Sequence, residues 1–383
     1  QLLISRYQEQ SNQESTVDDS PSNISETKNN SPSEDLWEKP DVSVFYGRDE
    51  ELKQLEELVV KEKAPLICLY GLPGIGKSYL VGKLVEQIKC DFDYVIWRSL
   101  SNRNQFSEIL KDLLKFIGLS ETTEPKKQAD EGISELIEHL RKHRCLIVLD
   151  NAEEIIREQD IYRRVKEGYE NYEILLRRMG TEQHKSCLLI NSCEKPGDID
   201  ILENSIRAVH SLKIDGLQSA DAKQLLNNKG LKEEKYLDIL IEYYGGNPLL
   251  LNIAIGIIKD VFNSNISEFT KNTLTTYGGN FEKKLIELFE HLSLSEVKVI
   301  KSINQVIDNE KKTDKKIPLN ILIKSIKKED KTSNIIEAIN SLIARSLIEV
   351  SEEDKNQVIY KLKPIVEKCV KKFLERQKKE FSE

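Results

Sequence analysis

The chain has 383 residues, of which 39% are hydrophobic and 32% charged, and its formal net charge is −8. This length allows two or three domains, and no apolar run approaches the roughly 18 residues that a membrane-spanning helix needs. Residues 1–280 carry a net negative charge that would repel phosphates, which argues against a general nucleic-acid-binding protein, although residues 281–383 carry a net positive charge. We expect a cytoplasmic protein without membrane contact, and since the first residue is Gln1, a piece of a longer one.

Residues 1–40 are rich in Ser, Asn, Gln, Glu and Asp. Such a stretch cannot bury enough apolar surface to offset its ordering entropy. We therefore expect a disordered linker over residues 1–40, with structure beginning near Val42. A helix is predicted next, because Leu52, Leu55 and Leu58 share one helical face.

Short apolar runs predict buried strands, and helical patterns separate them. Phe106 and the leucines that follow mark one such helix, which Gly118 ends. Strands that alternate with helices are typical of a parallel α/β sheet. The predicted strands are Pro65–Tyr70, Tyr94–Trp97, Cys145–Leu149 and Cys187–Ile190.

After Leu212 the pattern becomes helical, with helices expected near 218–228, 233–243, 248–262 and 265–274. Residues 281–383 predict four helices, two short strands and a last helix. Three helices with a small hairpin are the composition of a winged helix. The expected hairpin consists of Leu347–Val350 and Val358–Leu362, joined by the acidic turn Ser351–Asn356.

The six cysteines include no C-x-x-C pair, and the five histidines form no cluster. Cysteines inside apolar runs, such as Cys68, Cys145 and Cys187, are typical of core residues in a reducing compartment. The sequence therefore does not favour a zinc site.

The segment from Gly71 to Ser78 reads GLPGIGKS and matches G-x-x-x-x-G-K-[ST] between a predicted strand and a predicted helix. Glycines let the backbone wrap phosphates, and the helix beginning near Gly76 adds its positive end. Lys77 is expected to reach the β- and γ-phosphates, and the Ser78 hydroxyl to bind Mg²⁺. The alternative is a glycine-rich turn, but the flanking elements favour a phosphate loop. The predicted nucleotide contacts here are Gly71, Gly74, Ile75, Gly76, Lys77, Ser78 and Tyr79.

Asp150 ends the predicted strand Cys145–Leu149 and suits the second Mg²⁺ anchor, the Walker-B acid. The carboxyl edge of a parallel sheet is where a nucleotide lies. Asp150 could also cap a helix that begins near Ala152. Glu153 or Glu154 could polarise an attacking water, or they could be acids that the helix dipole favours. The candidate catalytic residues are therefore Asp150 and Glu153, and the candidate metal ligands Ser78 and Asp150.

Five motifs in this order resemble the NB-ARC type of STAND ATPases, which are signal-transduction ATPases that include apoptotic and plant disease-resistance switches. The resemblance covers about residues 42–380 and is greatest to the bacterial, especially cyanobacterial, branch. The motifs are Phe45-Tyr-Gly-Arg48, the loop from Gly71, LIVLDNAE from Leu146, CLLINSCEKP from Cys187 and GGNPLLL from Gly245.

The resemblance implies an ATP- or ADP-binding protein that uses Mg²⁺. Val44 and Phe45, with Arg48, would lie in the loop that packs the adenine. Pro248, in the G-x-P element, would touch the base or sugar from the helical domain, and it also suits a first helical position. Related proteins often carry an effector domain upstream and a WD-repeat or other sensor array downstream. We therefore expect sensor and effector domains outside this chain, and self-association in the ATP-bound state.

Two positions depart from the family pattern. Cys193 stands where relatives usually have an arginine that contacts the γ-phosphate. Cysteine cannot offer a bidentate cationic donor, so any ATP hydrolysis is expected to be slow. The second departure is Leu362-Lys363-Pro364, which stands where many eukaryotic relatives have the Met-His-Asp element that holds ADP.

Together these features predict an α/β protein: a P-loop parallel-sheet nucleotide-binding domain followed by an all-α helical domain and a winged-helix domain. The favoured function is an ATP/ADP-dependent signalling switch. Alternatives are an ATP-dependent DNA-binding regulator, which would use Ser333–Arg345 as its recognition helix, and an ordinary turnover NTPase. The expected domains are a linker at 1–40, an NB-ARC domain at 41–214, a helical domain at 215–276 and a winged helix at 277–383.

Overall fold

Six parallel strands form the central sheet of the first half of the chain, in the order β1-β3-β4-β5-β2-β6. The computed structural model describes residues 31–101, 105–119, 128–272, 279–310, 316–326, 330–353 and 357–380, so most of the expected linker lies outside it. Every residue of β4 and β5 is buried, as long apolar runs covered on both faces should be. The strands are β1 Ser33–Asp35, β2 Leu66–Tyr70, β3 Tyr94–Ser99, β4 Cys145–Asp150, β5 Cys187–Ser192 and β6 Val209–Lys213.

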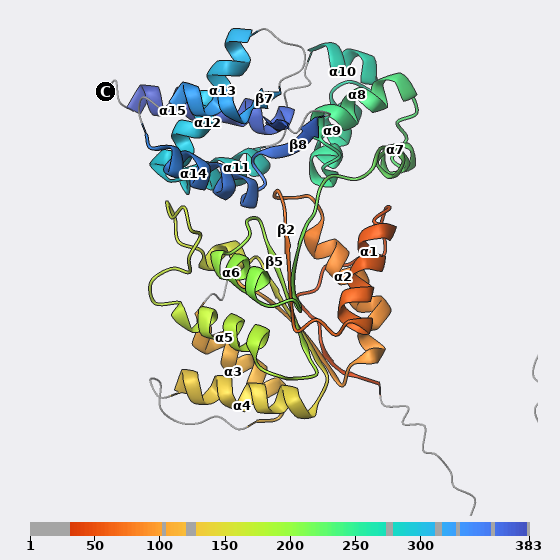
Figure 1. The fold of residues 1–383 in the computed structure, drawn as a ribbon. Helices are drawn as coiled ribbons and strands as arrows, with labels where there is room; N and C mark the ends of the chain where they lie inside the picture. The colour runs from red at the N-terminus through yellow and green to blue at the C-terminus, as the bar shows by residue number, and fades with distance from the viewer. Residues whose placement is uncertain are drawn as a thin grey trace, which may run out of the picture. The chain divides into compact units, whose positions relative to one another are not determined.

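Helices cover both faces of this sheet (Figure 1). Successive residues of a strand point to opposite faces. Leu66 and Cys68 of β2 therefore join one hydrophobic core, and Ile67 and Leu69 join the other. One face is covered by α1 (Asp49–Glu56), the π-helical turn η1 (Glu57–Lys61) and α2 (Lys77–Ile88), and the other by α3 (Phe106–Phe116), α4 (Gln128–Lys142), α5 (Glu170–Thr181) and α6 (Gly197–Ser205).

The four strands predicted from apolar runs are confirmed, with ends that differ by one or two residues. The edge strand β6 was not predicted, since no element was assigned between the strand that begins at Cys187 and the helices expected after Leu212. Only Val209 and Leu212 of β6 are fully buried. A half-buried edge strand does not form the continuous apolar run by which the inner strands were recognised.

The prediction of a linker throughout residues 1–40 is wrong for its last part. There β1 pairs in parallel with β3 and forms one edge of the sheet. Arg98 forms an ion pair of 2.5 Å with Asp35, and the Ser99 N–H donates to Glu38 at 2.5 Å. These acidic residues are thus ordered by cations and amides of the core, which composition alone does not reveal.

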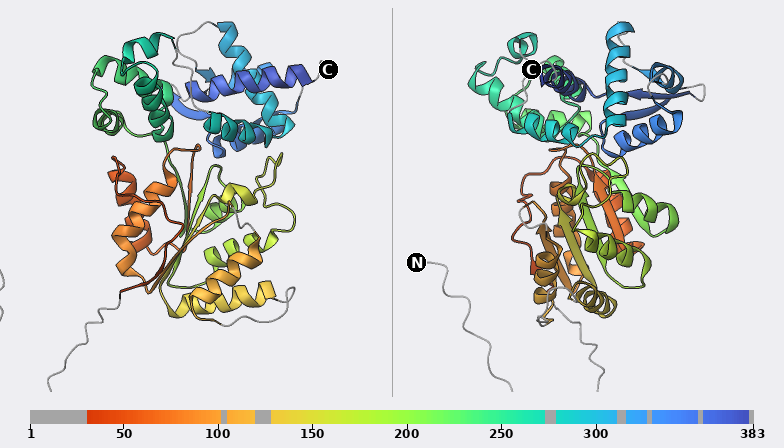
Figure 2. Two further views of the ribbon diagram at one scale, coloured as in Figure 1. Left: turned by 180° about the vertical axis from the view of Figure 1, so that it is seen from behind. Right: turned by 90° about the vertical axis from the view of Figure 1, so that its left-hand side faces the viewer.

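The second half of the chain is mainly helical, with a small antiparallel sheet in the order β7-β9-β8 (Figure 2). The two strands predicted here are confirmed, but β8 continues through Glu353, into the residues expected to form a turn. None of the helices in the described ranges is long and apolar enough to span a membrane. The elements are α7 Ser219–Asn228, α8 Glu234–Tyr244, α9 Pro248–Asp260, α10 Ile266–Asn272, α11 Gly279–Glu290, α12 Leu294–Glu310, β7 Ile317–Pro318, α13 Leu319–Ile326, α14 Thr332–Ala344, β8 Glu349–Glu353, β9 Gln357–Lys361 and α15 Pro364–Glu380.

A single hydrophobic core runs through this half, from Leu217 to Leu374. Phe289 of α11 and Phe373 of α15 lie in it with ring centroids 5.6 Å apart. The apolar packing is therefore continuous from the helices after β6 to the last helix.

A short connection, residues 214–218 between β6 and α7, joins the two halves. The Leu217 N–H donates to the Gly246 carbonyl at 2.9 Å. A Cβ atom on Gly216 would lie 1.8 Å from the Gly245 carbonyl oxygen. The connection and the Gly245-Gly246 turn therefore touch backbone to backbone, which only glycine allows.

We expect Gly216→Ala to lower the free energy of unfolding by about 1–3 kcal/mol, because the added methyl group forces two backbone segments apart. Gly256→Ala in α9 is the matched control, since nothing lies within 4 Å of the new Cβ. Alanine there should be neutral or stabilise by up to about 1 kcal/mol through helix propensity. Urea denaturation measures both. Equal stability of the two variants would contradict the close contact.

Candidate functional site

The glycine-rich loop connects β2 to α2, as the sequence predicted. Gly74 and Gly76 have φ angles of 71° and 101°, in the left-handed region that favours glycine. A Cβ atom on Gly74 would lie 2.6 Å from Leu249, and one on Gly71 would lie 2.5 Å from the Ile214 carbonyl oxygen. The loop thus needs glycine both for its backbone shape and for its close neighbours.

Lys77 is the first residue of α2, and its side chain folds back over the loop. Its Nζ atom donates to the carbonyl oxygens of Gly71 at 2.9 Å and Leu72 at 3.3 Å. Only 8% of the residue is exposed, and it forms no ion pair with a carboxylate anywhere in the described ranges. A buried ammonium is stabilised by an anion, so Lys77 suits a phosphate group.

Asp150 at the end of β4 and Ser78 in the first turn of α2 lie side by side. The Ser78 hydroxyl donates to Asp150 Oδ1 at 2.9 Å. Burial raises the pKa of Asp150, against the lowering effect of the Ser78 hydrogen bond. Hydroxyl and carboxylate oxygens are ligands that Mg²⁺ accepts. The chemistry of this pair therefore fits the metal role predicted for both residues.

The alternative role of Asp150, as a helix cap, finds no support. The segment after β4 is a short 3₁₀ turn, η3 (Ala152–Ile155), whose N-cap is Asn151. Asp150 accepts a hydrogen bond from the Asn151 N–H at 3.0 Å, outside that turn. Within the described parts of the chain, no group of three or more His, Cys, Asp or Glu is arranged for a metal. A Mg²⁺ ion here would therefore need phosphate oxygens and water as its further ligands.

Asn191 is a site residue to which the sequence analysis gave no role. It lies near the end of β5, which pairs with both β2 and β4. Its side chain is close enough to lower the pKa of Asp150, yet neither its Nδ2 nor its Oδ1 atom has a hydrogen bond of good geometry. A buried, unsatisfied amide between the two site strands suits a polar ligand. The signal in the sequence was a polar residue at the end of an apolar run.

Both carboxylate oxygens of Glu153 accept hydrogen bonds from Cys193. The Cys193 N–H donates to Glu153 Oε2 at 3.0 Å, and the thiol donates to Oε1 at 3.0 Å. Burial and the nearby Glu153 carboxylate raise the pKa of this thiol, so it stays protonated. Lys77 Nζ lies 3.7 Å from the sulfur atom. Of the two glutamates that the sequence left open, Glu153 is thus the one placed beside the phosphate loop.

Arg48 lies against the phosphate loop. It has a left-handed φ of 70°, and its Nη2 atom donates to the Ile75 carbonyl at 2.9 Å. The other residues predicted near the adenine differ in exposure. Val44 is 62% and Tyr79 49% exposed, whereas Phe45 packs partly against the core under α1 and α2.

The first turn of α9 lies on the same loop. Pro248 occupies a first-turn position and Asn247 is the N-cap, whose side chain accepts a hydrogen bond from the Leu249 N–H at 3.1 Å. The Asn247 side chain also donates to the Pro73 carbonyl at 3.0 Å. The predicted helix start is confirmed, and it contacts a loop about 170 residues earlier in the chain.

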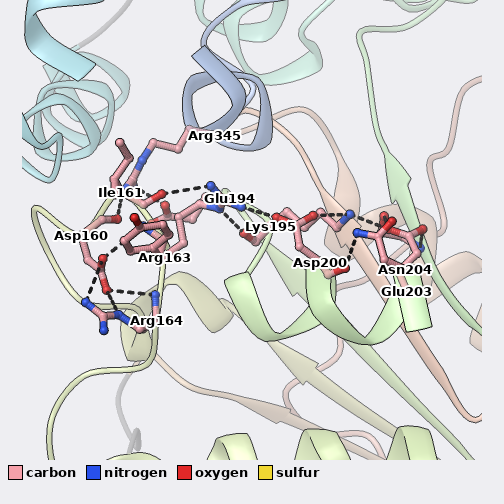
Figure 3. A network of polar contacts seen from close by, with 12 residues as sticks. Asp160, Ile161, Arg163, Arg164, Glu194, Lys195, Asp200, Glu203, Asn204 and Arg345 are labelled. Carbon is pink, nitrogen blue, oxygen red and sulfur yellow. Dashed lines mark hydrogen bonds and ion pairs between the residues drawn. The ribbon is translucent and has the colours of Figure 1, made fainter. Parts of the chain in front are cut away.

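The loop that follows β5 holds a buried ion-pair network (Figure 3). Glu194 and Arg345 form an ion pair in which both side chains are at most 1% exposed. Arg345 also pairs with Glu296 of α12 at 2.9 Å. From the sequence, Arg345 was expected only as the last residue of the candidate recognition helix Ser333–Arg345. Burial raises the pKa of Glu194 to about 7, although Arg345 opposes this.

Lys363 occupies the position where the Met-His-Asp element was sought. Its Nζ atom pairs with Asp215 at 3.0 Å and with Glu349 at 3.1 Å. Asp215 belongs to the connection between the two halves of the chain. Lys363 therefore ties α15 and β8 to that connection through charge.

Comparisons with known proteins agree with this geometry. Residues 48–205 match the NB-ARC domain family. A WD repeat-containing protein of Nostoc sp., described as uncharacterised, is 34% identical over 333 residues, which are 84% of this chain and 26% of the relative. A probable disease resistance protein of Arabidopsis thaliana is 27% identical over 117 residues, which are 30% of this chain and 16% of the relative. The chain thus spans about a quarter of these relatives or less.

A solved structure shares the fold. The Walker-type ATPase of Pyrococcus abyssi superimposes with a TM-score of 0.55 at 16% sequence identity. The alignment covers 85% of this chain and 96% of the other. At this identity the likeness establishes the fold, a P-loop ATPase sheet with helices, and nothing finer.

Raising the pH from about 5 to 8 should destabilise the wild type more than the Glu194→Gln variant. The additional loss in the free energy of unfolding should be on the order of 1–3 kcal/mol. The proton on Glu194 stabilises the fold below the ordinary pKa of 4.5, and this stabilisation is lost as the pH rises through about 7. The charged groups that face Glu194 are Arg345, Arg163, Glu296 and Glu153.

Glutamine mimics the protonated carboxyl, so the variant should lack this pH dependence. Thermal unfolding of both proteins across the pH range measures the difference. Parallel curves would contradict a raised pKa for Glu194.

Proposed function

We propose that this chain, whose residues 48–205 form an NB-ARC domain of the P-loop ATPase class, is the core of a switch controlled by ATP and ADP. It binds adenine nucleotide with Mg²⁺, changes conformation between the ADP- and ATP-bound states, and self-associates in the ATP state. The observation that carries this proposal is the convergence of Lys77, Ser78 and Asp150 at the carboxyl edge of the sheet, with the first turn of α9 on the same loop.

The phosphate loop would bind the nucleotide through its backbone and Lys77. Backbone N–H groups of the residues from Gly71 to Ser78 cradle the phosphates, and Lys77 moves from the loop carbonyls to the β- and γ-phosphates. Ser78 and Asp150 would hold Mg²⁺, which would supply positive charge beside those phosphates. Arg48 supports the loop through the Ile75 carbonyl.

The adenine side of the site would consist of residues from both halves of the chain. Val44, Phe45 and Tyr79 come from the first half, and Pro248 comes from α9 in the second. A nucleotide that touches both halves binds an open and a closed arrangement unequally, which is the physical requirement for a ligand-driven change of shape. We propose domains at 41–214, 215–276 and 277–383, the last a winged helix formed by α12 to α14 with β7 to β9.

The input and output of this switch would lie outside the chain. The Nostoc relative is described as a WD repeat-containing protein and is about four times longer than the matched segment. We propose that sensor and effector domains adjoin this core in a cytoplasmic protein. The sensor and effector domains would determine which signal is received and passed on, whereas the core would supply the nucleotide-dependent change of conformation.

Hydrolysis by this core would be slow. Cys193 lies 3.7 Å from Lys77 Nζ, close to where the charge of a transferring phosphoryl group develops. A neutral thiol cannot stabilise that charge as a guanidinium does. This argues against an ordinary turnover NTPase.

The alternative of a DNA-binding regulator is not favoured. The candidate recognition helix α14 is directed at the nucleotide-binding half, because Ala344 accepts a hydrogen bond from the Lys195 N–H at 3.0 Å. On the same helix Glu337 accepts one from the Tyr162 hydroxyl at 3.1 Å. Both of these contacts would have to break before DNA could cover this side of α14.

Lys77→Ala should abolish binding of ADP and ATP, because Lys77 is the only cationic residue of the loop from Gly71 to Ser78. Lys83→Ala is the matched control: Lys83 lies on the same helix, and its ion pair with Glu86 is 3.6 Å long. Isothermal titration calorimetry with Mg²⁺ and each nucleotide measures both. Wild-type affinity in Lys77→Ala would refute the proposed site.

Cys193→Arg should raise the steady-state rate of ATP hydrolysis about tenfold or more, since a cation beside the γ-phosphate stabilises transition-state charge. Cys193→Ser controls for loss of the thiol and should leave the rate low. Release of inorganic phosphate measures the rates. Rapid turnover by the wild type would contradict the role given to Cys193.

A further inference from the structure

The carboxyl end of α14 contacts two consecutive residues of the loop after β5. Glu194 forms the buried ion pair with Arg345, and the Lys195 N–H donates to the Ala344 carbonyl at 3.0 Å. The guanidinium also donates to the Asp160 carbonyl at 3.1 Å. Figure 3 shows Arg345 above this loop, with the polar network continuing through Lys195 to Asp200. The end of α14 is thus fixed to the nucleotide-binding half through both side-chain and backbone contacts.

Because the Arg345 guanidinium and its partners are buried, water cannot replace a contact that is lost. Arg345 is completely buried, and so is Glu296, its second carboxylate partner. Each of the three guanidinium nitrogens has an acceptor: Glu296 for Nε, Glu194 for Nη1 and the Asp160 carbonyl for Nη2. A buried guanidinium that loses one such partner is left with an N–H group that has no acceptor. A displacement of Arg345 must therefore either displace Glu194 as well or break their buried ion pair.

The preceding residue of the same loop contacts the nucleotide site. Cys193 donates from its N–H to one oxygen of Glu153 and from its thiol to the other. One peptide step separates this contact from Glu194. A shift of Glu194 must therefore move the groups that bind Glu153.

We propose that Arg345 is a positioning residue for hydrolysis, acting through Glu194 on Glu153. While Arg345 holds Glu194, both oxygens of the Glu153 carboxylate are bound to Cys193, and hydrolysis is suppressed. When α14 leaves, the loop relaxes and Glu153 is free to accept a proton from water. The water oxygen then bonds to the γ-phosphorus, the bond to the β-phosphate oxygen breaks, and its electron pair leaves with ADP. This inference rests on the proposed nucleotide function.

The test compares the wild type with Glu194→Gln, Arg345→Lys and the double variant. Glu194→Gln keeps an acceptor but removes the charge, and Arg345→Lys keeps the charge but loses the guanidinium geometry. Arg164→Met is the control, because Arg164 lies in the same network but its ion pair with Asp160 stays within one loop. Single-turnover hydrolysis of Mg²⁺-ATP is measured, together with the dissociation constant of a fluorescent ADP derivative and the melting temperature of each protein.

Each single variant should hydrolyse ATP about fivefold faster or more, with the ADP dissociation constant within about twofold of the wild type. The double variant should be no faster than the faster single variant, because both changes act on one pair. Arg164→Met should match the wild type. A purely structural role of the pair would instead lower stability without changing the single-turnover rate constant.

Unchanged rates in folded variants, or rate increases that multiply in the double variant, would overturn the inference. If one single variant does not fold, the other alone decides the outcome by the same rate criterion. If the wild type binds no nucleotide, the proposed function fails and this inference fails with it. If it binds nucleotide but the variants behave as the wild type, only the inference fails.

Discussion

The loop that leaves β5 must satisfy partners on both sides at once, and the arrangement of the nucleotide site depends on it. Strand β5 lies between β2, which leads into the phosphate loop, and β4, which ends in Asp150. Its last residues therefore emerge between the two elements that would hold phosphate and metal. Cys193 binds Glu153 in the site, and Glu194 binds Arg345 beyond it. Since the chain between them is one peptide unit long, the site cannot be altered without an effect on α14.

Other polar contacts also join the two halves. Asn247 donates to the phosphate-loop carbonyl of Pro73, and Lys363 pairs with Asp215 of the connection. Buried hydrogen bonds and ion pairs are directional and costly to leave unpaired. Such hydrogen bonds and ion pairs are either formed or broken, whereas two apolar surfaces can slide over each other. Such an interface suits two distinct arrangements selected by a ligand.

The parts of this account that the sequence could predict are those encoded locally. The phosphate loop, the strand that ends in Asp150 and the proline that begins α9 each have a pattern of a few neighbouring residues. β1 and β6 were missed because edge strands are half exposed and lack an apolar run. Arg345 was misjudged because nothing near it in sequence distinguishes a buried arginine from a surface one. Its partners, Glu194 and Glu296, lie 151 and 49 residues away. Only the fold brings them together.

The proposed switch requires adenine nucleotide to select between arrangements of the two halves. Small-angle X-ray scattering of the purified chain, with Mg²⁺-ADP and with Mg²⁺ and a non-hydrolysable ATP analogue, tests it most directly. We expect a compact particle with ADP and a larger radius of gyration or a higher mass with the analogue. Identical scattering in the two states, with both nucleotides shown to be bound, would contradict it.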